Sequence, residues 1–92
     1  MSKKGGEGLR IDRLLVYLRF ARTRLLARAM IEGRSLRCNR KRVRRVSETV
    51  SIGDVLTFAV GNDIRVVEVI SLPERRLSPS LAKTFYRERD RA

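Results

Sequence analysis

Apolar residues recur at helical spacing in two segments near the start of the chain. The first segment predicts a helix over residues 10–22, because one face collects four apolar residues at the i, i+3, i+4 and i+7 positions: Ile11, Leu14, Leu15 and Leu18. Val16 and Phe20 are apolar but lie outside this face. We therefore expect another element, such as the C-terminal tail, to cover them.

The second segment predicts a helix over residues 24–32. Thr23 is a suitable N-cap, and Gly33 ends the helix because glycine accepts the left-handed conformation that often follows a C-cap. The apolar face consists of Leu26, Ala27, Met30 and Ile31. Arg24 and Arg28 are four residues apart, so both project from one face, away from the apolar residues. Because a cation in the first turn opposes the helix dipole, an anion bound near Arg24 would offset that cost.

Strand periodicity dominates the middle of the chain. Residues 55–60 alternate between two faces, residues 61–63 form a hairpin turn, and residues 64–72 return as a strand. A shorter strand is expected over residues 35–39. A last helix is expected over residues 81–89, with three residues facing inward: Leu81, Ala82 and Phe85. This order predicts an α+β fold, a small single domain in which two N-terminal helices pack on a small, mostly antiparallel sheet, with a C-terminal tail or short helix.

The charge of the chain is strongly one-sided. Its 92 residues include 22 Lys and Arg against 10 Asp and Glu, which gives a net charge of +12. Residues 1–45 hold 15 of the basic and 3 of the acidic residues, so the whole excess lies in the first half. Such an excess on so small a body indicates a polyanionic partner. We expect residues 1–8 to be a flexible basic N-terminus, residues 9–72 the binding domain, and residues 73–92 a partly helical tail.

The residue types that are missing exclude several kinds of chemistry. With no His and one Cys, the chain has neither a His-based catalytic triad nor a tetrahedral Cys/His zinc site. No paired carboxylates or glycine-rich phosphate loop stand out, so we expect no enzyme activity, no cofactor and no metal. Cys38 alternates with Leu36, which favours a small core residue over the alternative of a redox-sensitive thiol. The longest apolar run has five residues, against ~20 for a membrane span, so we expect a cytoplasmic protein without a membrane partner.

Basic side chains are the candidate nucleic-acid contacts. Residues 40–45 contain five cations, with Val43 and Val46 placed to anchor the segment to the core. We expect Asp12 to stabilise the first helix or to orient a neighbouring arginine, while Arg28 has Glu32 as an alternative partner. No aromatic residue lies in the basic run, which favours recognition of backbone shape over base stacking. The predicted nucleic-acid-binding residues are Arg10, Arg13, Arg22, Thr23, Arg24, Arg28, Arg37, Asn39, Arg40, Lys41, Arg42, Arg44 and Arg45.

Four short pieces of sequence carry a family resemblance. In order, they are Leu9-Arg10-Ile11-Asp12-Arg13-Leu14-Leu15, Thr23-Arg24-x-x-Ala27-x-x-Met30-Ile31-x-Gly33, Ser35-Leu36-Arg37-Cys38-Asn39 and Val50-x-x-Gly53-Asp54-x-Leu56. Together they make about half of the chain similar to the S-four RNA-binding domain, named after the fourth small-subunit ribosomal protein. The family often has glycine after the asparagine, where this chain has Arg40.

The resemblance implies a function on the ribosome. In that family the two helices and the loop after the first strand form a basic surface that docks on folded RNA. Residues 19–33 and 81–86 look closest to the heat-shock protein 15 family, which usually has a longer basic C-terminal extension. This likeness implies binding to rRNA of the large ribosomal subunit, with a tRNA contact left open, in rescue or quality control of stalled particles. From the residues alone, the alternatives are a general nucleic-acid binder that includes DNA, and a basic protein- or membrane-surface module.

Overall fold

Ten short elements make up the described part of the chain. The structure is a computed structural model, which describes residues 8–33 and 35–89. In chain order the elements are β1 (Leu9–Arg10), α1 (Ile11–Tyr17), α2 (Arg24–Glu32), β2 (Leu36–Cys38), β3 (Lys41–Arg42), β4 (Thr49–Val50), β5 (Val55–Val60), β6 (Asp63–Val69), α3 (Pro79–Ala82) and β7 (Tyr86–Arg89). Of the expected flexible N-terminus, residues 1–8, the first seven lie outside the described residues.

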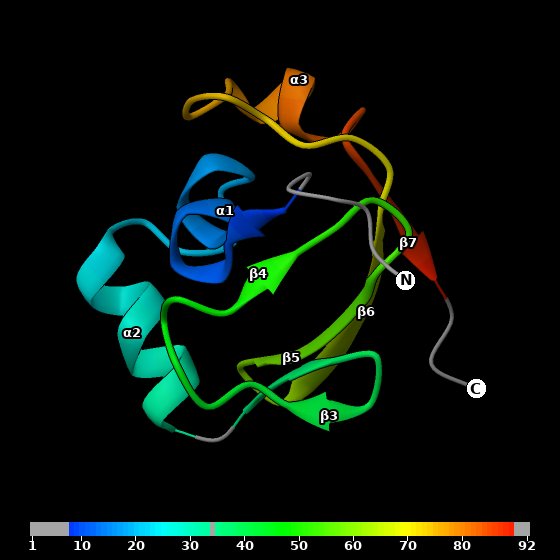
Figure 1. Ribbon diagram of the computed structural model, residues 1–92. Helices are drawn as coiled ribbons and strands as arrows, with labels where there is room; N and C mark the ends of the chain where they lie inside the picture. Colours follow the sequence, from blue (N-terminus) through cyan, green and yellow to red (C-terminus); the bar gives the residue numbers. More distant parts are fainter. Residues whose placement is uncertain (1–7, 34, 90–92) are drawn as a thin grey trace.

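The two N-terminal helices pack on an antiparallel sheet of five strands. The strand order is β3-β2-β5-β6-β7, and α1 and α2 lie beside the sheet (Figure 1). A second sheet pairs β1 with β4, which the sequence did not predict because two residues are too few to show an alternating pattern. The predicted α+β class, with two helices on a mostly antiparallel sheet, is confirmed.

The hydrophobic core lies between the helices and the sheet. The predicted apolar face of α1 is fully buried, and Leu56, Phe58 and Val67 face it from β5 and β6. Val43 is 1% exposed, so the expected anchor in the basic run is confirmed. Burying each of these side chains contributes about 1.5–3 kcal/mol, which is the main force that holds the helices on the sheet.

The first helix ends five residues earlier than its pattern predicts. α1 stops at Tyr17, and Arg19 turns the chain with a left-handed φ of 67°. The amide of Phe20 then donates to the carbonyl oxygen of Leu15 at 2.8 Å, a bond that closes a tight loop in place of another helical turn. The prediction of a helix to Arg22 is therefore wrong.

Packing of Phe20 explains this early turn. Its ring lies 5.0 Å from that of Phe58 and 4.8 Å from that of Tyr86, measured between centroids. The segment after β6, yellow and orange in Figure 1, passes over the end of α1, where the Leu77 amide donates to the Tyr17 carbonyl oxygen at 3.1 Å. The expectation that the C-terminal tail covers Phe20 is confirmed, and this tertiary contact outweighs helix continuation.

The second helix has the bounds that its sequence predicts. The Thr23 hydroxyl accepts a hydrogen bond from the amide of Leu26 at 3.1 Å, which confirms the N-cap. Gly33 follows the helix, but its φ of −77° is not left-handed, so that expectation is wrong. The need for glycine is steric, because a Cβ on Gly33 would lie 3.0 Å from the carbonyl oxygen of Ala29.

The last predicted helix is wrong for most of its length. Instead of a helix over residues 81–89, the chain forms the short α3 and then β7, which pairs with β6 from Val66 opposite Arg89 to Val69 opposite Tyr86. The free edge of β6 offers unpaired backbone groups that β7 satisfies, and this outweighs local helix propensity. Leu81 is 42% exposed, contrary to prediction, whereas Ala82 is buried and Phe85 packs against the core.

Candidate nucleic-acid interface

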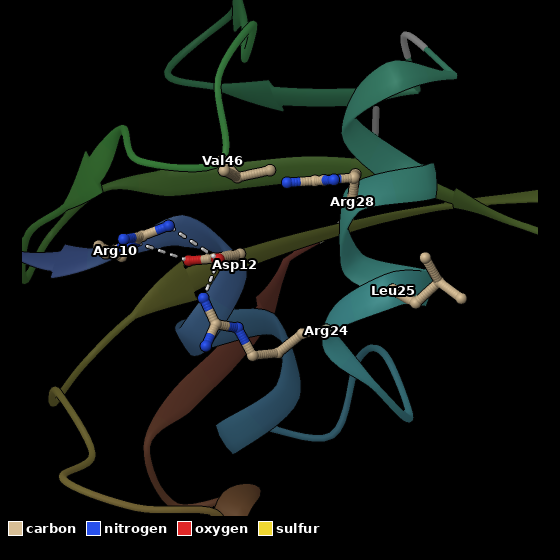
Figure 2. A pocket seen from close by; sticks show the side chains of 6 residues that line it. All are labelled: Arg10, Asp12, Arg24, Leu25, Arg28 and Val46. Carbon is tan, nitrogen blue, oxygen red and sulfur yellow. Dashed lines mark hydrogen bonds and ion pairs between the residues drawn. The ribbon is translucent and has the colours of Figure 1, made fainter.

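Three of the predicted contact residues meet in one pocket, here named the arginine pocket. Arg10 reaches it from the junction of β1 and α1, and Arg24 and Arg28 extend into it from successive turns of α2 (Figure 2). Its volume is about 340 Å³, and its lining is completed by Asp12, Leu25 and Val46. The expected common face of Arg24 and Arg28 is thereby confirmed. Within the described residues, the alternative ion pair between Arg28 and Glu32 is not formed.

A buried carboxylate joins two of these arginines. Asp12 is 3% exposed, and its Oδ1 accepts from Arg10 Nε at 3.2 Å and from the backbone amide of Arg13 at 2.9 Å. Its Oδ2 accepts from Arg10 Nη2 at 3.2 Å and from Arg24 Nη2 at 2.9 Å. The expectation that Asp12 orients a neighbouring arginine is confirmed. Its negative charge also offsets part of the unfavourable interaction between the helix dipole and Arg24, a cation in the first turn of α2.

The Asp12 carboxyl stays ionised because its partners outweigh its burial. Burial alone would raise the pKa of Asp12, since a low-dielectric environment disfavours the charged form. The hydrogen bonds and positive charges of Arg24 and Arg10 act in the opposite direction, and they leave the pKa below its ordinary value. Three guanidinium groups and one carboxylate line the pocket, so its net charge is positive, which suits an anionic ligand.

The basic run is tied to this pocket through the backbone. The amide of Ile11 donates to the carbonyl oxygen of Glu48 at 2.7 Å. The amide of Asp12 donates to the carbonyl oxygen of Val46 at 3.4 Å. The chain that leaves the basic run therefore lies against the first turn of α1. Val46 packs against the core and lines the arginine pocket, as its predicted anchoring role requires.

Glu48 orders the end of the basic run, a role that the sequence analysis missed. Its Oε2 accepts from the amides of Arg44 and Arg45 at 2.8 and 3.1 Å, while both arginine side chains remain exposed. The available signal was an acidic residue three positions after a block of cations, close enough to accept their backbone N–H groups. The result is a fixed turn that presents two cations beside Val46.

The start of the basic run is a tight hairpin turn between β2 and β3. Asn39 and Arg40 have φ values of 52° and 75°, the left-handed pair that a two-residue hairpin of type I′ requires. Arg40 therefore keeps the backbone that glycine would adopt and adds an exposed cation. The Asn39 side chain donates to Asp54 Oδ1 at 3.0 Å and accepts from the amide of Val55 at 2.9 Å, so it serves to shape this turn. The Arg37 guanidinium donates to the Arg40 carbonyl oxygen at 3.3 Å.

The remaining predicted contact residues lie outside the arginine pocket. Arg13 is exposed on α1, Lys41 is exposed on β3, and Arg42 is half-buried. Thr23 caps α2 beside the pocket. Arg22 lines a different hollow, mostly apolar and of about 450 Å³, between α2 and the end of β5. The structure thus gathers part of the predicted set and separates Arg22 from it.

The other titratable groups of interest serve the fold. Cys38 packs against the core as expected and is half-buried, with its Sγ 3.7 Å from Asp54 Oδ2. Asp54 also accepts from the amide of Ser51 at 2.9 Å, and its own amide donates to the Ser51 carbonyl oxygen at 3.0 Å, so it closes the turn before β5. In the described part of the chain, no three His, Cys, Asp or Glu side chains gather as a metal site. No helix among those same residues has the length and apolarity to cross a membrane.

Comparisons with known proteins place the chain in a family. The S4 domain model, which is the S-four domain of the sequence analysis, matches residues 9–56. Heat shock protein 15 of Escherichia coli K12 is 39% identical over 88 residues, which cover 96% of this chain and 65% of that protein. The heat shock protein 15 homolog of Haemophilus influenzae is 34% identical over 80 residues, which cover 87% of this chain and 60% of that one.

A solved structure agrees with these sequence matches. The trimeric structure of Vibrio cholerae heat shock protein 15 superposes with a TM-score of 0.84 at 34% identity, covering 90% of this chain and 83% of that one. This chain spans 65% of the length of the Escherichia coli relative. The chain therefore belongs to the S4 domain family of RNA-binding domains, and within that family it is similar to heat shock protein 15.

Proposed function

We propose that this protein docks on structured rRNA of the large ribosomal subunit. The contact face consists of the arginine pocket together with the basic segment, residues 40–45. The observation that carries the proposal is the convergence of Arg10, Arg24 and Arg28 in one positively charged pocket, with the basic segment tied to its edge through Val46. Membership of the S4 domain family supports RNA as the partner.

The chemistry of this face suits phosphate groups. A guanidinium group donates two parallel N–H bonds to a phosphate, and a charge-assisted bond of this kind is roughly twice as strong as a neutral one. The exposed cations of the basic segment extend the contact along the backbone. For a protein with ~6–10 phosphate contacts, the affinity falls by ~10³–10⁵ between ~50 and ~200 mM salt.

The biological role that we infer is rescue or quality control of stalled ribosomal particles in the cytoplasm. Its support is the similarity to heat shock protein 15 over most of this chain. A tRNA held on such a particle offers the same phosphate chemistry, so a tRNA contact belongs to this proposal. The fixed turns that present Arg40, Arg44 and Arg45 fit a rigid, folded RNA surface better than a flexible strand.

Sucrose-gradient sedimentation tests this function. Lysate containing tagged protein is run at two salt concentrations, with and without ribonuclease. We expect the protein to sediment with large subunits at moderate salt and to remain at the top after ribonuclease. Protein that stays at the top without ribonuclease would contradict a ribosomal partner. Equal affinity for duplex DNA and folded RNA would favour the general nucleic-acid binder, and sedimentation with anionic vesicles would favour the surface module.

A further inference from the structure

We propose that Asp12 is a positioning residue that makes the arginine pocket select rigid RNA phosphates over flexible polyanions. This inference rests on the proposed function, because it assumes that RNA phosphate enters the pocket. It goes further by assigning specificity to an acidic residue, a type that is not expected to touch an anion.

The first argument is electrostatic. A pocket that only attracted phosphate would be stronger without a carboxylate in its wall. Asp12 is nonetheless ionised there, since its pKa lies below the ordinary value, and its negative charge opposes every anion that enters. The carboxylate therefore weakens general attraction, and its contribution to binding has to come from geometry.

The second argument is that geometry. Arg10 and Arg24 come from separate elements, yet their guanidinium groups meet on the same carboxylate (Figure 2). Their side chains remain 38% and 58% exposed, so most of their N–H donors are available to a ligand. A long side chain that is already held loses less conformational entropy on binding. The gain is largest for a phosphate that the RNA fold itself holds still.

Arg28 completes the pocket with a charge that Asp12 does not offset. Within the described residues it has no ion-pair partner, and Figure 2 shows its side chain extending to the same side of α2 as Arg24. The pocket thus combines two arginines held by a carboxylate with one that is not. A ligand has to match the fixed pair to gain from all three.

The test compares two probes on an Asp12→Asn variant. The probes are a folded transcript of large-subunit rRNA and heparin, a flexible polyanion without base pairing. Removing the charge should raise heparin affinity, while loss of the fixed pair should cut the preference for rRNA over heparin by about tenfold, the size of one good charge-assisted contact. Asp63→Asn is the matched control, because it removes the same charge from an exposed residue that does not line the pocket. The Asp63→Asn control should show the same preference for rRNA over heparin as the wild type.

Two further variants separate positioning from folding. Asp12→Glu keeps the charge and should restore part of the preference. Arg24→Lys keeps the net charge at an exposed site but loses the planar fork that reaches Asp12, so it should lower rRNA affinity by more than heparin affinity and thereby cut the preference for rRNA. If Asp12→Asn fails to fold, Arg24→Lys decides the question.

The possible outcomes are distinct. An rRNA preference that stays within about twofold of wild type in both Asp12→Asn and Arg24→Lys would overturn the inference. Equal loss of affinity for both probes would show a purely structural role and would also overturn it. Wild-type protein that does not bind rRNA would instead overturn the proposed function, together with this inference.

Discussion

Replacing Arg40 with glycine should stabilise the protein and weaken its binding to RNA. Arg40 sits in the β2–β3 turn with a φ of 75°, which costs a residue with a Cβ about 1–2 kcal/mol. Glycine removes that strain but loses about 0.5–1 kcal/mol through its greater freedom in the unfolded chain. The net stabilisation is about 0.5–1 kcal/mol, which corresponds to a Tm rise of about 3–6 °C for a domain of this size.

The same change removes an exposed cation from the basic segment. If Arg40 contacts one phosphate, Arg40→Gly should lower the slope of log affinity against log salt by about one. Arg40→Ala is the matched control, because it removes the cation but keeps the Cβ. It should lose the same salt slope without gaining the same Tm.

Thermal unfolding and salt titration on both variants check these two effects separately. A Tm for Arg40→Gly no higher than that for Arg40→Ala would refute the strain argument. A salt slope that is unchanged in both variants would refute the proposed contact between Arg40 and a phosphate.

Two other contacts give predictions that stability measurements check. Glu48→Ala removes the acceptor for the Arg44 and Arg45 amides and should cost about 1 kcal/mol in urea unfolding, together with some RNA affinity; an unchanged midpoint would contradict the role of this turn. The pKa of Glu88 is lowered mainly by hydrogen bonds from Arg65, at 3.0 and 2.7 Å. This contribution to stability is present above the unfolded-state pKa near 4.5 and is lost as the pH falls through the lower folded-state value. Because the Glu88 side chain is 52% exposed, Glu88→Gln should cost less than about 1 kcal/mol at pH 7, with the difference vanishing in acid, and a difference that persists in acid would contradict the assignment.

Local sequence signals were sufficient where an element depends on its own residues. The bounds of α2 follow from its apolar spacing and from the Thr23 cap, and β5 follows from strict alternation. Prediction from the sequence failed where contacts between residues distant in the chain determine the local structure. Phe20 is held by rings on β5 and β7, which ends α1 early, and the open edge of β6 recruits residues that local propensity assigned to a helix.

In the candidate site, too, the sequence predicted local features and missed contacts between residues that are distant in the chain. The i, i+4 spacing of Arg24 and Arg28 is a local property and correctly placed both on one face. Arg22 lies only two residues before Arg24 but lines another hollow, because the chain turns between the two helices. Convergence of Arg10 with Arg24 on Asp12 depends on how α1 packs beside α2, which spacing along the chain does not encode.

The most direct test of the interface compares two charge-matched double variants on large-subunit rRNA. Arg24→Gln with Arg28→Gln removes two cations from the arginine pocket. Arg75→Gln with Arg76→Gln removes two exposed cations from the segment after β6, which does not line that pocket. The salt slope should fall by about two in the pocket variant and by much less in the control. Equal salt slopes and equal affinities in the two variants would contradict the arginine pocket as the RNA contact.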